Sequence, residues 1–129
     1  MNISELIGKT LTSIRVSPDK ETITFYERTG RKYRMYHEQD CCERVQVEDI
    51  VGSLKSLVNS PILEASERTS DTDPERLVSI NHDESFTWTF YIISTIKGTV
   101  TLRWLGESNG CYSESVSFEE VLSDGRQNI

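Results

Sequence analysis

The chain has 129 residues, of which 36% are hydrophobic and 27% charged, a composition typical of one globular domain and not of a disordered segment. Its 14 basic and 21 acidic residues give a net charge of −7, which repels nucleic-acid phosphates and favours a basic protein partner. It contains neither an apolar run near the roughly 20 residues that cross a bilayer nor a secretory signal at its N-terminus. We therefore expect a single cytoplasmic domain over residues 1–129 that contacts no membrane and no nucleic acid directly.

The first half of the chain alternates apolar and polar residues with the period of half-buried strands. Turn-forming residues separate the segments, so the first strands are expected to form an antiparallel meander. A helix of two or three turns is predicted over 50–58, where the apolar residues fall at helical spacing. One helical turn is predicted at 3–7, and strands are predicted at 10–17, 21–28, 31–38 and 43–50.

The second half contains the strongest strand signal, a hairpin of β-branched and aromatic residues over 85–104. Lys97-Gly98 is its predicted two-residue turn. We expect this hairpin to form the core through two sets of alternating residues, which are Phe86, Trp88, Phe90 and Ile92 in its first strand and Val100, Leu102 and Trp104 in its second. A further strand at 112–118 and a short helical turn at 118–122 complete the prediction. The fold class is therefore α+β and β-rich, mostly an antiparallel twisted sheet of hairpins with two or three short helices.

The cysteines favour thiol or metal chemistry over a disulfide framework. There are three, an odd number, and two of them are adjacent, which disfavours pairing because the bridge would strain the peptide between them. His37 ends a predicted strand and Cys41 and Cys42 open the next, so a structural zinc ion could hold this reversal of the chain. The spacing is not that of a standard zinc motif, and a further ligand is needed from among Cys111, His82, Asp40 and Glu43.

The same residues also have a purely structural interpretation. Cys41 shares the alternation of Val45 and Val47, so it fits a small buried side chain, and His37 fits a donor to a backbone carbonyl. A Cys–His nucleophile would need an orienting acid and an oxyanion hole, and no flanking motif supplies them. No catalytic residues are therefore predicted, and the chain is not expected to be an enzyme.

An acidic loop is predicted over 67–84, with six carboxylates against two arginines. It lacks the ligand spacing of a calcium loop, so we interpret it as a solvated acidic surface. The candidate contacts to a basic partner are its carboxylates, which are Glu67, Asp71, Asp73, Glu75, Asp83 and Glu84.

Two segments carry a resemblance to known proteins. The chain is similar to a family of small bacteriophage and prophage proteins in these segments. They are MYHEQDCCE at 35–43 and, within 85–116, SFTWTFY, KGTVTLRW and SNGCYSESV. The chain also resembles the type II-A anti-CRISPR proteins, inhibitors of Cas9 that carry zinc. This resemblance implies a zinc-containing Cas9 inhibitor in the bacterial cytoplasm. The ligands that we predict for the zinc, from the residue types, are His37, Cys41, Cys42 and Cys111. The chain departs from the family pattern at Cys111, where an aromatic residue is expected, and this weakens Cys111 as a shared ligand.

Three hypotheses for function follow. The first is a protein-binding inhibitor that blocks the loading of target DNA onto Cas9, whose channels are basic. The second is a small metal-dependent or thiol-dependent phage enzyme that uses the histidine and the adjacent cysteines. The third is a phage accessory protein with no role against host defences.

Overall fold

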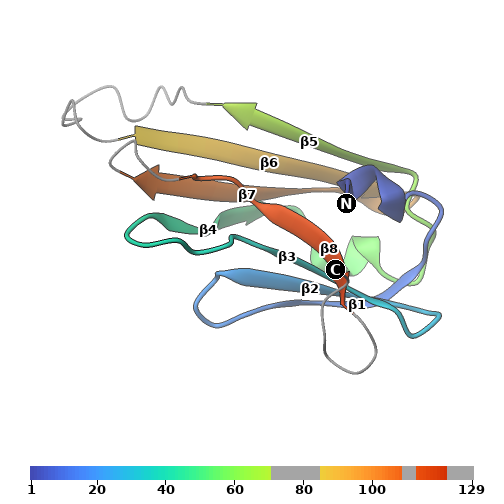
Figure 1. Cartoon of the computed structure of the whole chain (residues 1–129). Helices are drawn as coiled ribbons and strands as arrows, with labels where there is room; N and C mark the ends of the chain where they lie inside the picture. The colour runs from blue at the N-terminus through green and yellow to red at the C-terminus, as the bar shows by residue number, and fades with distance from the viewer. Residues whose placement is uncertain (71–84, 109–112, 122–129) are drawn as a thin grey trace.

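The computed structural model describes residues 1–70, 85–108 and 113–121, which form two antiparallel sheets of four strands each. Figure 1 shows β5, β6 and β7 above β1, β2 and β3, and one hydrophobic core lies between the two layers. The first sheet has the order β1-β2-β3-β8 and consists of β1 (Leu11–Val16), β2 (Thr22–Glu27), β3 (Lys32–Tyr36) and β8 (Ser117–Val121). The second sheet has the order β4-β7-β6-β5 and consists of β4 (Arg44–Val51), β5 (Glu64–Ser70), β6 (Ser85–Thr95) and β7 (Gly98–Ser108).

The first sheet begins as the predicted meander and closes with a strand from the far end of the chain. β8 pairs with β3, with Phe118 opposite Met35. The ring of Phe118 stacks on that of Tyr33 at 6.0 Å and meets that of Phe25 edge-on at 5.8 Å. The helical turn predicted at 118–122 was therefore wrong over its described residues, because the segment pairs with β3 as a strand and buries Phe118 against the rings of Phe25 and Tyr33.

The second sheet is built around the predicted β6–β7 hairpin. Thr95 pairs with Gly98, so the two turn residues are Ile96 and Lys97, one position earlier than predicted. Of the outer strands of this sheet, β4 has the predicted length, shifted by one residue, whereas β5 is longer than the sequence suggested. β5 continues to Ser70, into the segment expected to be a loop.

The register of the hairpin separates the two sets of residues that were both expected in the core. Trp88 pairs with Leu105 and Thr89 with Trp104, so Trp88 and Trp104 lie on opposite faces of the sheet. The Trp104 face joins Tyr91 in the core, where Trp104 and Tyr91 are at most 1% exposed. Phe86, Trp88, Phe90 and Ile92 do share a face, as predicted, but it is the outer one.

The helical content is small. The described residues contain two short 3-10 helices, η1 (Ile3–Leu6) and η2 (Leu54–Leu57), and none of their helices is long and apolar enough to span a membrane. The helix predicted over 50–58 is shorter because β4 continues through a bulge and pairs Ile50 with Leu102. β4 ends before Gly52, whose φ is +105° and where a Cβ would lie 2.7 Å from the carbonyl oxygen of Thr99. The β-rich fold of antiparallel hairpins with short helices is thus confirmed.

Candidate functional site

The loop that links the two sheets, residues 37–43, is folded around the carboxylate of Glu43. This carboxylate lies 2.7 Å from Nε2 of His37 and accepts backbone N–H groups from Asp40 at 2.8 Å and Cys41 at 2.9 Å. The side chains of His37 and Glu43 are 4% and 0% exposed. Because a buried carboxylate needs several donors, these contacts hold the chain reversal between β3 and β4 in one conformation.

The electrostatics of the loop follow from these donors. The hydrogen bond from His37, supported by the N–H groups of Cys41 and Asp40, lowers the pKa of Glu43 to about 2, against the opposing effect of burial. The side-chain amide of Gln39 donates to the carbonyl oxygens of Glu43 at 2.7 Å and Cys41 at 3.1 Å. Glu43 is therefore an ionised anchor of the fold.

His37 also ties this loop to the chain that enters β8. Its Nδ1 lies 2.6 Å from the carbonyl oxygen of Ser115 and donates to it. The alternative prediction that His37 binds a backbone carbonyl is confirmed. One imidazole thus connects the β3–β4 loop to a residue 78 positions later in the chain.

The adjacent cysteines form a disulfide, Cys41–Cys42, and both are exposed. The prediction of reduced thiols, and the interpretation of Cys41 as a buried residue, were therefore wrong. The peptide between the cysteines lies in a bend, and neighbouring hydrogen bonds hold that bend, so the two side chains meet.

The three predicted zinc ligands that the structure describes, His37, Cys41 and Cys42, are engaged in other contacts in this conformation. The cysteine sulfurs are bonded to each other and both nitrogens of His37 face oxygen atoms. Within residues 1–70, 85–108 and 113–121, no group of three or more His, Cys, Asp or Glu side chains is arranged to hold a metal ion. Cys111 and His82 lie outside the described residues.

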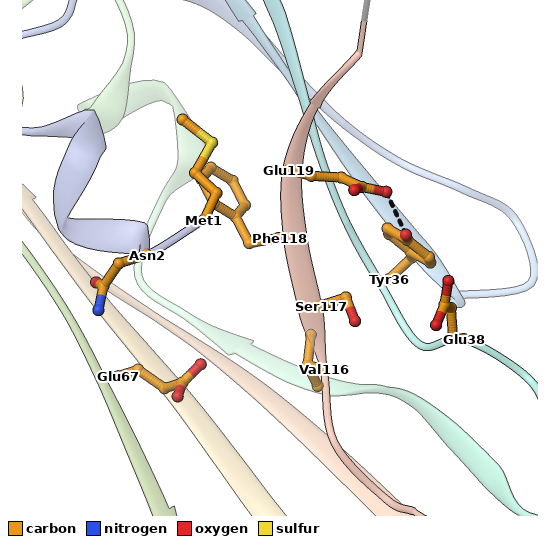
Figure 2. Close-up of a pocket in the computed structure, with 9 residues that line it drawn as sticks. All are labelled: Met1, Asn2, Tyr36, Glu38, Glu67, Val116, Ser117, Phe118 and Glu119. Atoms are coloured by element: carbon orange, nitrogen blue, oxygen red, sulfur yellow. Dashed lines mark hydrogen bonds between the residues drawn. The ribbon is translucent and has the colours of Figure 1, made fainter. Parts of the chain in front are cut away.

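A second feature is an open cleft of about 410 Å³ around the edge strand β8 (Figure 2). Residues 116–119 cross its centre, with Glu67 and Asn2 on one side and Tyr36, Glu38 and Glu119 on the other. The cleft is lined by Met1, Asn2, Tyr36, Glu38, Glu67, Val116, Ser117, Phe118 and Glu119.

The cleft is strongly acidic. Three of its lining side chains are glutamates and none is a lysine or arginine. The hydroxyl of Tyr36 donates to Glu119, and burial together with this carboxylate raises the pKa of Tyr36 to about 12. Tyr91, the cross-strand neighbour of Glu67, is 1% exposed, and its hydroxyl has no hydrogen-bond partner of good geometry among the described residues. Burial, and then the carboxylate of Glu67, raise the pKa of Tyr91.

Of the predicted partner contacts, only Glu67 lies within the described residues. It belongs to the face of β5 that carries Ala65, and it also lines a neighbouring opening of about 290 Å³ beside Thr69 and Thr87. Glu67 is exposed, as a contact must be. The other predicted contacts, Asp71, Asp73, Glu75, Asp83 and Glu84, lie outside the described part of the chain.

Sequence reasoning gave Glu43 only a minor role, as one of several possible ligands, although a signal for it was present. Glu43 shares the alternation of Val45 and Val47, which face the core, so a carboxylate at that position must be buried and needs donors. No comparable signal marked Glu38 and Glu119. They line the same cleft as Glu67 because β8, which follows the second sheet in the chain, pairs with β3.

Comparison with known proteins gives a family but no described relative. No curated protein and no solved structure matches the chain. Residues 4–118 match the model of the family described as Domain of unknown function (DUF7448), and they include the loop around Glu43, β5 and the start of β8, so the chain belongs to this family.

Proposed function

We propose that this domain binds a basic, extended segment of another protein along β8, at the edge of the strand that is opposite β3. The observation that supports this most directly is the lining of the cleft. Four consecutive residues of the chain, 116–119, line the cleft together with Glu38 and Glu67, so with Glu119 the lining has three glutamates and no basic side chain. A lysine-rich or arginine-rich segment laid along β8 would find charge partners on both sides of the strand.

The position of β8 suits such a partner. Among the described strands, β8 is at the end of the first sheet and is paired with β3, so a further strand could be added at its other edge. Extended peptides commonly bind by adding a strand to an edge of this kind, with side-chain pockets giving specificity. Glu67 from β5 and Glu119 from β8 would supply that specificity for basic residues.

The particular role that we propose is inhibition of a host defence nuclease of the Cas9 type in the bacterial cytoplasm. The resemblance of HEQDCCE and of the β6–β7 region to phage proteins supports this role, as does the net charge of −7. Cas9 holds RNA and DNA in basic channels, so an acidic domain bound there would compete with DNA loading. The domain would act by binding and without catalysis.

A cleavage assay tests this role. Pre-incubation of guide-loaded Cas9 with the protein should inhibit DNA cleavage, and Glu67→Arg should weaken binding more than Glu67→Gln. Replacing one exposed charge typically changes affinity by about two-fold to five-fold, which sets the expected effect of Glu67→Gln. Glu48→Gln is the matched control, because Glu48 is an exposed strand glutamate outside the cleft.

Hydrogen exchange then tests the binding site. The amides of 116–121 should become protected on binding, whereas those of β1 should not change. Inhibition without protection of β8, or with equal loss of affinity in Glu48→Gln, would show that the cleft is not the site. Failure to bind Cas9, combined with capture of a synthetic lysine-rich peptide by β8, would reject the nuclease and keep the basic partner.

Zinc remains a proposal that depends on the state of the cysteines. Cys41 and Cys42 can bind a metal only as thiolates, which the disulfide does not provide. We therefore expect zinc in elemental analysis only of protein purified under reducing conditions, and none after oxidation. Stoichiometric zinc that survives oxidation would mean that the cysteines are not its ligands.

A further inference from the structure

The outer face of the second sheet carries an apolar surface that does not belong to the core. The register of the four strands places six apolar side chains on this face, which are Val51, Phe86, Trp88, Phe90, Ile92 and Leu105. Val51 is 52% exposed, and Phe86, Phe90 and Ile92 are partly exposed. Trp88 and Leu105, at 7% and 8% exposed, are largely covered by their neighbours, so a partner would contact mainly Val51, Phe90 and Ile92. An antiparallel sheet with one solvated face normally alternates apolar and polar residues, whereas β6 is apolar on both faces along Phe90–Ile93.

The first sheet provides an internal comparison. Its outer face carries mainly hydroxyl and charged groups, including Thr22, Thr24, Arg15, Lys32 and Arg34. The two outer faces belong to sheets of equal strand number in one molecule. The apolar character is therefore particular to the second sheet, and a face of this kind usually marks an interaction surface.

The centre of this face is already ordered. The guanidinium of Arg103 lies 4.9 Å from the ring centroid of Trp88 and 5.8 Å from that of Phe90. The two rings are stacked with centroids 5.9 Å apart, and Arg103 also approaches Asp49 at 3.5 Å. Tryptophan and arginine are the residues most enriched at the energetic centres of protein interfaces. Little side-chain entropy remains to be lost when a partner covers this group.

The charges on the face identify the partner. Glu48, the bulge residue of β4, is an exposed carboxylate beside this face. The paired positions of the described strands place three arginines and three carboxylates on the face itself, so these charges balance on a chain whose net charge is −7. These residues are Arg44, Arg68 and Arg103 and Asp49, Glu64 and Glu107. A strongly charged face would repel its own copy, whereas a balanced one can be self-complementary about a two-fold axis.

From this balance we propose that two copies of the chain associate through the outer face of the β4-β7-β6-β5 sheet. The contact is isologous, with Phe90 and Ile92 near its centre and arginines of one copy facing carboxylates of the other. It lies on the opposite side of the second sheet from Glu67, whose face is that of Ala65 and the core. A dimer therefore leaves two acidic clefts free, and its existence does not depend on the proposed function.

Sedimentation equilibrium of the full chain over a wide concentration range tests the dimer. Wild-type protein should reach twice the chain mass, and Ile92→Asp should shift the dissociation constant upward by at least ten-fold, because it buries a charge at the interface. Thr24→Asp is the matched control, on the outer face of β2, and should leave the dimer unchanged. Wild-type protein that stays monomeric, or an Ile92→Asp variant that still dimerises, would overturn the proposal.

A charge exchange keeps the test decisive if Ile92→Asp fails to fold. Arg68→Glu makes the face net negative in both copies and should weaken the dimer, and adding Glu64→Arg restores the balance and should restore association. Loss of the dimer without rescue in the double variant would contradict self-complementarity. If wild-type protein is monomeric but the face binds another protein, the partner is not a second copy and the proposal fails.

Discussion

At the scale of single residues, Glu43 decides the conformation of the segment that was expected to bind metal. Its carboxylate accepts hydrogen bonds from the imidazole of His37 and from two backbone N–H groups. These bonds order the loop in which the chain reverses between the two sheets. Sequence reasoning looked for a cation at this place. In the structure the ionised carboxylate of Glu43 holds the loop together, so the stability of the loop depends on pH.

Glu43→Gln should remove this pH dependence. The pKa of Glu43 is lowered from 4.5 to about 2, so between these values the unfolded state binds a proton that the folded state does not. The stabilisation is therefore complete above pH 4.5 and is lost as the pH falls toward 2. Urea denaturation of wild type and Glu43→Gln from pH 6 to pH 2 should show curves that differ most at pH 6 and converge on acidification. Parallel curves would contradict this account.

At the scale of elements, the β3–β4 loop is held by hydrogen bonds more than by its disulfide. Cys41 and Cys42 are neighbours in sequence, so the bridge constrains the unfolded chain very little. The side chains of His37, Gln39 and Glu43, by contrast, join backbone groups across the loop and at Ser115.

The double variant Cys41→Ser/Cys42→Ser should therefore be nearly as stable as the wild type. Because the entropy of loop closure falls with loop length, we expect the free energy of unfolding to fall by no more than about 1 kcal/mol. Chemical denaturation with and without a reductant checks this value, and the reductant should affect only the wild type. A variant that does not fold would show that the bridge, and not Glu43, holds the loop.

Local alternation predicted most of the fold but not how its faces are arranged. β2, β3 and the β6–β7 hairpin follow from their alternating residues, because a period of two leaves few other ways to bury Ile23, Phe25 or Leu102. The outward position of Trp88 could not be predicted, because it depends on a cross-strand register and on which face meets the other sheet.

The candidate site was predictable only in part, for a related reason. His37 and Glu67 were identified from sequence, whereas Ser115 and Glu119 join them through contacts between distant segments. Local patterns carry no information about such pairs. Residue type alone also could not predict that Cys41 and Cys42 pair, because the bend that brings them together is fixed by Glu43 and Gln39.

At the scale of the whole molecule, the two proposed surfaces differ in the force that drives binding. The β8 cleft is a concentration of like charge, whereas the outer face of the second sheet is apolar with balanced charges. Salt screens the first interaction and does not weaken burial of apolar area.

Raising the salt concentration should therefore separate the two associations. Binding of a basic partner should weaken steeply between about 0.05 M and 0.5 M salt, since the Debye length falls to a few ångströms over this range. The dimer should weaken much less, because salt screens its arginine–carboxylate pairs but not the burial of its apolar side chains. Calorimetry for the partner and sedimentation for the dimer, in the same buffers, measure both. A partner affinity that is independent of salt would argue against an electrostatic cleft.

The return of β8 to β3 has a consequence for synthesis on the ribosome. The first three strands of the first sheet emerge early, but their fourth neighbour follows the entire second sheet in the chain. Until β8 is synthesised, the edge of β3 has no strand paired to it. Unpaired edges can pair with other chains and cause aggregation, so we expect a nascent chain to need protection at this edge. Residues 116–119 also line the cleft, so the surface that we propose for partner binding is completed last. A chain that terminated before β8 would lack this surface and would leave the edge of β3 uncovered.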